Sequence, residues 1–117
     1  MLSSANSNSS DIRGTHRRAQ RCLRRGEVRK ALQLLRENAA NDPSGATFCW
    51  LAHALVAAGK REEALSALRQ ALYCFRHEQT HPRARTVARL ILRLDPGDGA
   101  ARKVEARGCA RERRRAA

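Results

Sequence analysis

Aromatic residues, acidic residues and long apolar runs are all scarce in this chain. Aromatics make up 3% of its 117 residues, so alanine and leucine must form most of any core. No apolar run approaches the ~18 residues that a membrane-spanning helix needs. The Ser/Asn-rich start also has no apolar stretch of the kind found in secretion signals. We therefore expect one small domain without a membrane span.

Sequence signatures of catalysis and metal binding are missing as well. There is no Gly-rich phosphate loop, no carboxylate pair and no CxxC motif. The four cysteines lie in apolar-periodic segments, which predicts buried free thiols in a reducing compartment; they are Cys22, Cys49, Cys74 and Cys109. We expect no enzymatic activity, no cofactor, no bound metal and a cytoplasmic location.

Positive charge, by contrast, is in excess. The formal net charge is +13 at pH 7 and comes almost entirely from arginine. Residues 1–45 hold 9 Lys/Arg against 4 Asp/Glu, residues 46–81 hold 4 against 3, and residues 82–117 hold 11 against 4. The basic ends therefore flank a nearly neutral middle, and they favour anionic partners: acidic proteins or peptides, nucleic acid or anionic lipid.

Two stretches of the chain repeat one another. The segments "RRGEVRKAL" (24–32) and "AAGKREEAL" (57–65) each have a glycine followed five residues later by an alanine. Gly26 and Gly59 are 33 residues apart, as are Ala31 and Ala64. Self-similarity at this period is typical of stacked helical repeats.

Apolar residues recur at helical spacing in six segments. The expected helices cover residues 12–25, 28–39, 46–58, 60–77, 82–94 and 100–110. The third segment is apolar on nearly all sides, so we expect it to be buried between other helices. The resulting division is a disordered tail (1–10), a helical domain (11–110) and a basic tail (111–117).

This pattern resembles the tetratricopeptide repeat family, whose units of about 34 residues are helix–turn–helix pairs. Residues 12–44 match it at Ala19, Gly26, Ala31 and Asp42-Pro43. Residues 45–78 match it at Leu51, Ala52, Gly59, Ala64, Leu68 and Ala71. The small residues allow close helix crossings, glycine relieves the turn and proline ends the second helix.

The last third of the domain departs from the family pattern. Asp95-Pro96, with Ala84 before it, matches the end of a second helix, but only 20 residues separate Ala64 from Ala84. Asn38 also stands where the first repeat would have a buried alanine. We interpret residues 82–110 as a degenerate third pair, with an extended cap as the alternative.

The resemblance implies a short right-handed α-solenoid that binds a partner segment, without catalysis, in a concave groove lined by the first helix of each pair. Carried over residue by residue, the groove-facing positions are Arg13, His16, Arg17, Gln20 and Arg24 in the first repeat and Ala46, Cys49, Trp50, His53 and Val56 in the second. Our partner-binding candidates are Arg13, His16, Arg17, Gln20, Arg24, Cys49, Trp50 and His53. A basic wall beside an apolar floor favours an acidic segment with a hydrophobic anchor.

Several of these residues have a second interpretation. The periodicity favours Trp50 as a core residue, although tryptophan is also typical of binding hot spots. The arginines at 17, 21 and 24 share one helical face, which suits either binding or solvation. Cys49 and His53 lack an orienting acid, which argues against a nucleophilic pair.

A metal site has little support. Cys74, His77 and His81 have the spacing C-x2-H-x3-H, but Pro82 interrupts the helix and no fourth ligand is evident.

Two other functions remain open. The basic ends would serve a nucleic-acid-associated protein that contacts phosphates without reading sequence. Self-association is also open, because two or three repeats are near the minimum for a stable stack.

Overall fold

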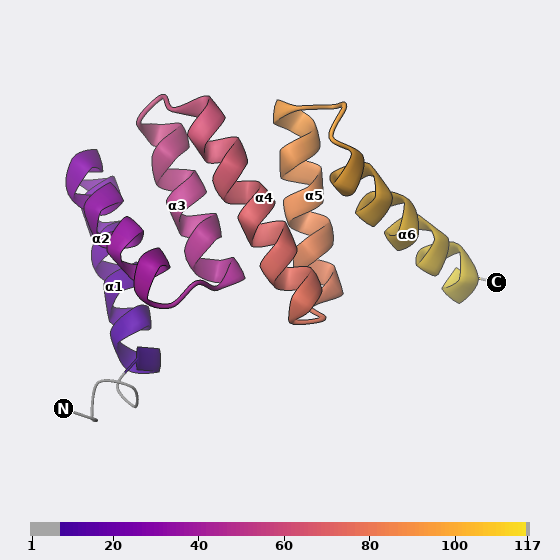
Figure 1. The fold of residues 1–117 in the computed structure, drawn as a ribbon, viewed down its shortest axis with the longest axis horizontal. Helices are drawn as coiled ribbons and strands as arrows, with labels where there is room; N and C mark the ends of the chain where they lie inside the picture. The colour runs from indigo at the N-terminus through magenta and orange to yellow at the C-terminus, as the bar shows by residue number, and fades with distance from the viewer. Residues whose placement is uncertain (1–7, 117) are drawn as a thin grey trace.

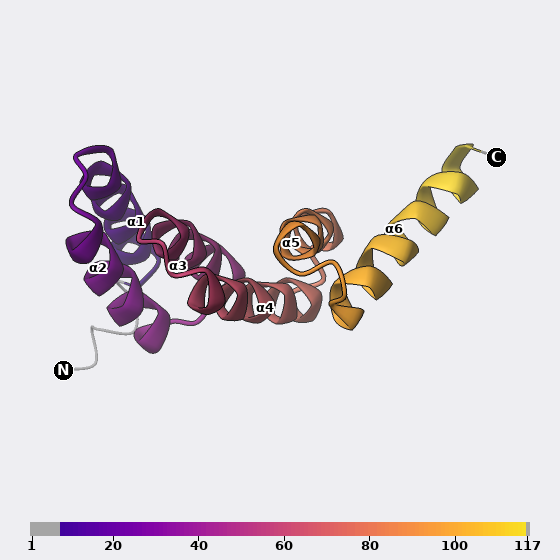
Figure 2. The same cartoon turned by 90° about the horizontal axis from the view of Figure 1, so that it is seen from above.

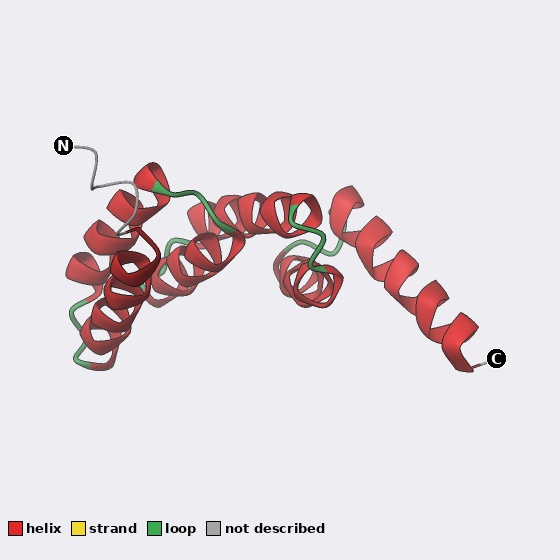
Figure 3. Cartoon of the chain, turned by 90° about the horizontal axis from the view of Figure 1, so that it is seen from below, coloured by secondary structure: helices red, strands yellow, loops and turns green. Residues whose placement is uncertain are grey.

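The computed structural model describes residues 8–116, which form six helices joined by short turns (Figure 1). The helices are α1 (Asn8–Arg24), α2 (Val28–Asn41), α3 (Gly45–Ala57), α4 (Arg61–His77), α5 (His81–Leu94) and α6 (Gly99–Ala116). Figure 3 shows that this part of the chain contains helices and loops and no strand. The predicted all-α class is confirmed.

The helices form an open row in which each packs against the next. Successive helices run in opposite directions (Figure 1), and α1 also contacts α3. Seen from above (Figure 2), the row is bent, and α6 points away from the other five helices. The radius of gyration of the chain is 15.6 Å, whereas a compact chain of this length would have a value of about 13 Å. This arrangement is consistent with a short helical repeat.

Alanine and leucine form the core, as the composition predicts. Ten of the 21 buried apolar residues are alanines, and Leu35 and Ile91 are among the largest side chains that are fully buried. The apolar helix α3 contacts three others, α1, α2 and α4. One side of α3 nevertheless stays open to solvent, because Val56 is 55% exposed and His53 is also exposed.

Three of the five turns have the same hydrogen-bonded geometry. After α1, the Gly26 N–H donates to the Leu23 carbonyl (3.1 Å) and the Glu27 N–H to the Cys22 carbonyl (2.8 Å). The turns that follow α3 and α4 repeat this pair of bonds around Gly59 and Gln79. All three central residues have positive φ, at 79°, 75° and 60° in chain order. This is the Schellman ending of a helix, which favours glycine at its left-handed position.

The other two turns also share a geometry. Asp42 after α2 has φ −146° and ψ 84°, and Asp95 after α5 has φ −141° and ψ 90°. The next helix is capped in each case by a side-chain oxygen that accepts a backbone N–H: Ser44 Oγ from Thr47 (3.2 Å) and Asp98 Oδ2 from Ala101 (3.0 Å). At both of its ends, α5 therefore resembles α2.

This similarity changes how the last third of the chain is divided. Ala84 follows the central residue of its turn, Gln79, by five positions, as Ala31 follows Gly26. Ala84 and Ala31 are both fully buried against neighbouring helices. By its turns α5 is therefore most like α2, whereas α4 begins like α2 but ends like α1 and α3.

The last helix is longer than expected, since α6 continues to Ala116 and includes residues 111–116 of the predicted basic tail. At the other end α1 begins at Asn8; the rest of the predicted N-terminal tail, residues 1–7, lies outside the described residues.

Helix α6 packs on α5 through a small apolar contact and a set of ion pairs. Ala101 is its only fully buried apolar residue. Glu105 of α6 accepts hydrogen bonds from Arg85 (3.1 Å) and Arg89 (3.1 Å) of α5, and Glu112 also pairs with Arg85. These hydrogen bonds, with Arg85 as the main donor, lower the pKa values of Glu105 and Glu112.

The turn geometry gives a first prediction. Replacing Gly59 by alanine forces a left-handed conformation on a residue with a Cβ and should lower the free energy of unfolding by about 1–2 kcal/mol. Nothing lies within 4 Å of the added Cβ, so the loss of stability measures backbone strain and not a steric clash. Gln79→Gly should instead raise stability by up to about 1 kcal/mol. Urea unfolding followed by circular dichroism measures both.

Gln79→Ala is the matched control, because it removes the side chain and keeps the strained φ. If Gln79→Ala stabilised the protein as much as Gln79→Gly does, backbone strain would not be the cause.

Candidate functional site: the pocket between α1 and α3

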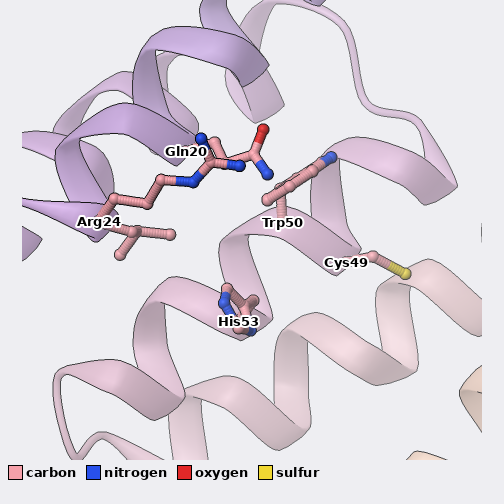
Figure 4. A pocket seen from close by; sticks show the side chains of 6 residues that line it. Gln20, Arg24, Cys49, Trp50 and His53 are labelled. Atoms are coloured by element: carbon pink, nitrogen blue, oxygen red, sulfur yellow. The ribbon is translucent and has the colours of Figure 1, made fainter.

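A pocket of about 530 Å³ lies between α1 and α3. Its lining residues are Gln20, Leu23 and Arg24 from α1 and Cys49, Trp50 and His53 from α3. In Figure 4, Gln20 and Arg24 extend from α1 toward the Trp50 ring. The volume falls within the range of about 300–1,000 Å³ that is usual for ligand sites.

A polar contact beside the pocket ties its two helices together. His16 Nε2 of α1 lies 3.1 Å from Thr47 Oγ1 of α3, and Thr47 Oγ1 also lies 2.9 Å from Ser44 Oγ. Thr47 is fully buried, so these partners satisfy a hydroxyl that would otherwise be costly to bury. The contact fixes the position of α3 relative to α1 at the end of the pocket.

Beside this contact the ring of His16, from α1, meets the rings of Trp50 and His53, from α3, in a row centred on Trp50. The Trp50 ring centroid is 6.2 Å from that of His16 and 6.3 Å from that of His53, which meets Trp50 edge-on at 87°. Trp50 is half-buried and lines the pocket, so it is neither a fully buried core residue nor a fully exposed one. A tryptophan held between two neighbours keeps a rigid apolar face for a ligand.

The basic residues of α1 continue the pocket on one side. Arg13, Arg17 and Arg24 are exposed and share one face of α1 by their spacing. In the described part of the chain, no carboxylate lies within ion-pairing distance of any of the three. The site therefore combines an apolar surface with positive charge that has no internal partner.

The structure brings most of the predicted binding residues together. Gln20, Arg24, Cys49, Trp50 and His53 line the pocket. His16 lies beside it through its contact with Trp50, whereas Arg13 and Arg17 are outside the lining.

Sequence analysis missed Leu23 as a pocket residue, since its apolar side chain fitted the core face of the first helix. Leu23 is half-buried and lies three residues after Gln20, so helical spacing from the polar candidates would have identified it. Ala46 and Val56, also placed in the groove, are not in the lining.

The thiol in the pocket is protonated near neutral pH. Burial raises the pKa of Cys49 to about 11, against a smaller opposite effect of the Arg83 guanidinium. Within the described residues no hydrogen bond joins Cys49 to His53. Of the four cysteines, all free, Cys22 is buried as predicted and the other three are only half-buried.

The Cys74, His77 and His81 spacing does not produce a metal site. α4 ends at His77 and α5 begins at His81, so the three residues do not share a helix. His77 instead stacks on Tyr73, with ring centroids 5.6 Å apart. Across residues 8–116 no group of three His, Cys, Asp or Glu side chains is arranged to hold a metal ion.

Comparison with known proteins gives no match: no family model fits the chain, and no curated protein is significantly similar to it. None of the helices between residues 8 and 116 combines the length and apolar character required to span a membrane.

The His16 contact gives a pH prediction. Burial lowers the pKa of His16 below its ordinary value of 6.5, so the folded state favours the neutral ring. The neutral His16 ring contributes its full stability to the fold above pH 6.5. This contribution is lost as the pH falls below 6.5, because the unfolded chain then binds the proton more readily than the folded chain.

Unfolding free energies of the wild type and His16→Gln, measured between about pH 7.5 and about pH 5, test this. The wild type should lose more stability over this interval than the variant. Equal losses would show that His16 does not contribute to the pH dependence.

Proposed function

We propose that this chain is a non-catalytic interaction module that holds a segment of a partner protein in the α1–α3 pocket. The observation that carries the proposal is the combination of the half-buried Trp50 face with the unpaired Arg24 at one concave site. Tryptophan and arginine are the residue types most enriched among binding hot spots.

Charge and apolar area together define the segment that fits. Arg17 and Arg13 lie about one and about two turns before the pocket on the same face of α1 as Arg24, so they extend the positive surface beyond the pocket. We infer an acidic peptide segment whose one apolar side chain enters between Leu23 and Trp50. Electrostatic attraction accelerates the association of the acidic segment, and the apolar contact slows its dissociation.

The proposal is also supported by the architecture. The chain resembles tetratricopeptide repeats in the residues at its helix crossings and turns, and the first two pairs repeat one turn geometry at Gly26 and Gly59. In tetratricopeptide repeats the first helices of adjacent pairs line the binding surface, and the resemblance assigns this role to α1 and α3, which line the pocket.

Binding of labelled peptides tests the proposal. Short acidic peptides that differ only in a central Phe, Leu or Ala are titrated with the protein, and fluorescence anisotropy is measured. The Phe and Leu peptides should bind about tenfold more tightly than the Ala peptide. Trp50→Ala should remove this preference, because it removes the apolar face. Thermal unfolding checks that the variant remains folded.

A charge-reversal pair separates site electrostatics from general attraction. Arg17→Glu with Arg24→Glu should weaken binding of the Phe peptide more than Arg18→Glu with Arg25→Glu, which changes the net charge equally elsewhere on the surface. Binding should persist at moderate salt, whereas phosphate-driven binding would fall steeply. The proposal fails if the Ala peptide binds as tightly as the Phe peptide. It also fails if the two double variants lose the same amount of affinity for the Phe peptide.

A further inference from the structure

A second pocket, of about 610 Å³, lies at the opposite end of the row between α5 and α6. Six of its lining residues are arginines that come from three helices: Arg76 of α4, Arg85 and Arg89 of α5, and Arg107, Arg111 and Arg115 of α6. Glu112 is the only carboxylate in the lining. The pocket is far from the α1–α3 site along the chain and along the row (Figure 1).

The six arginines divide into two groups. Arg85 and Arg89 are engaged by Glu105 and Glu112, in the ion pairs that hold α6 against α5. The other four have no carboxylate within ion-pairing distance among residues 8–116; they are Arg76, Arg107, Arg111 and Arg115. The carboxylates near this pocket, Glu105 and Glu112, are thus paired with Arg85 and Arg89, and the other four arginines add positive charge that no carboxylate pairs with.

Such an arrangement is locally unfavourable without an anion. Arg107, Arg111 and Arg115 follow one another at four-residue intervals on α6, which places them about 6 Å apart along one helix face. Like charges at this spacing destabilise a helix. A ligand with several negative charges would relieve this repulsion and bridge α4, α5 and α6.

We propose that the α5–α6 pocket binds a compact ligand carrying a chain of two or more phosphate groups. Guanidinium groups hold phosphate oxygens through paired N–H bonds, and arginine is the residue that suits such planar recognition best. The lining contains no Trp, Tyr or Phe on which a nucleobase would stack, so the phosphate chain is the recognised part.

The shape of the pocket favours a small ligand over a polymer. Its arginines converge on one hollow from three helices, and its volume suits a ligand of nucleotide size. Arg113 and Arg114 of the same helix are exposed and lie outside the lining. A long polyanion would use these two arginines as readily as the pocket residues.

Calorimetric titration of the full chain with inorganic tripolyphosphate, at about 0.15 M salt, tests the proposal. Tripolyphosphate should bind saturably, about tenfold or more tightly than orthophosphate, and should raise the melting temperature. Arg107→Gln with Arg111→Gln should weaken its binding about tenfold, and Arg113→Gln with Arg114→Gln by less than about threefold. Both double variants remove two charges from exposed positions of α6, and circular dichroism verifies their helicity.

Two further measurements separate the alternatives. Arg76→Gln, on a different helix, should also weaken binding, since the ligand bridges to α4; no effect of Arg76→Gln would contradict the convergence of the three helices. ATP and tripolyphosphate should bind within about threefold of each other. Binding of ATP alone would overturn the assignment to the phosphate chain.

General charge attraction has its own signature. Equal losses of affinity for tripolyphosphate in the two α6 double variants would overturn the proposal. So would binding of single-stranded oligo(U) RNA that tripolyphosphate fails to displace, because the arginines would then serve an extended strand.

Discussion

Neighbouring helices of this chain approach closely because alanine occupies their crossings. Ala19, Ala31, Ala64, Ala84 and Ala101 are all at or near zero exposure, and each belongs to a different helix. Close approach lets the few leucines of a chain that is poor in aromatics pack at normal density. It also keeps the row thin: the shortest dimension is 20 Å, about two helix diameters. Trp50 and the α5 arginines Arg85 and Arg89 line the two pockets of this thin row.

A short core leaves the position of the helices to polar contacts at the two ends of the row. At one end the His16–Thr47 hydrogen bond connects α1 to α3 across 31 residues of sequence. At the other end Arg69 binds both Asp95 (3.0 Å) and Asp98 (2.9 Å), and thereby joins α4 to the turn before α6. Neither set of contacts lines a pocket, but each joins elements that carry pocket residues.

The helices and their order could be predicted from the sequence because each depends on local periodicity. Expected helix ends differ from the observed ones by at most two residues for α2 to α5, where proline, glycine or a cap marks the boundary. The end of α6 could not be placed in this way. Its last residues lack an apolar stripe, and the carboxylate that fixes them, Glu112, finds its partner Arg85 only in the folded chain.

The candidate site was only partly predictable for the same reason. The family resemblance selects every lining position of α1 and α3 except Leu23, because helical spacing determines which residues share a face. It could not decide between burial and exposure for Trp50, which depends on the crossing of α1 and α3. Nor did it predict the α5–α6 pocket, whose arginines converge from helices separated by up to 39 residues, from Arg76 to Arg115.

The resemblance of α5 to α2 has a consequence for how such a chain changes over evolutionary time. Between Ala64 and Ala84 the pattern is 13 residues shorter than the 33-residue spacing of the first two pairs, about the length of one helix. A helix that touches mainly its immediate neighbours can be deleted while the rest of the row closes over the gap. Such a loss would reverse the alternation of helix direction beyond that point, so that α5, which has the turns of α2, would run in the direction of α1 and α3, as it does here.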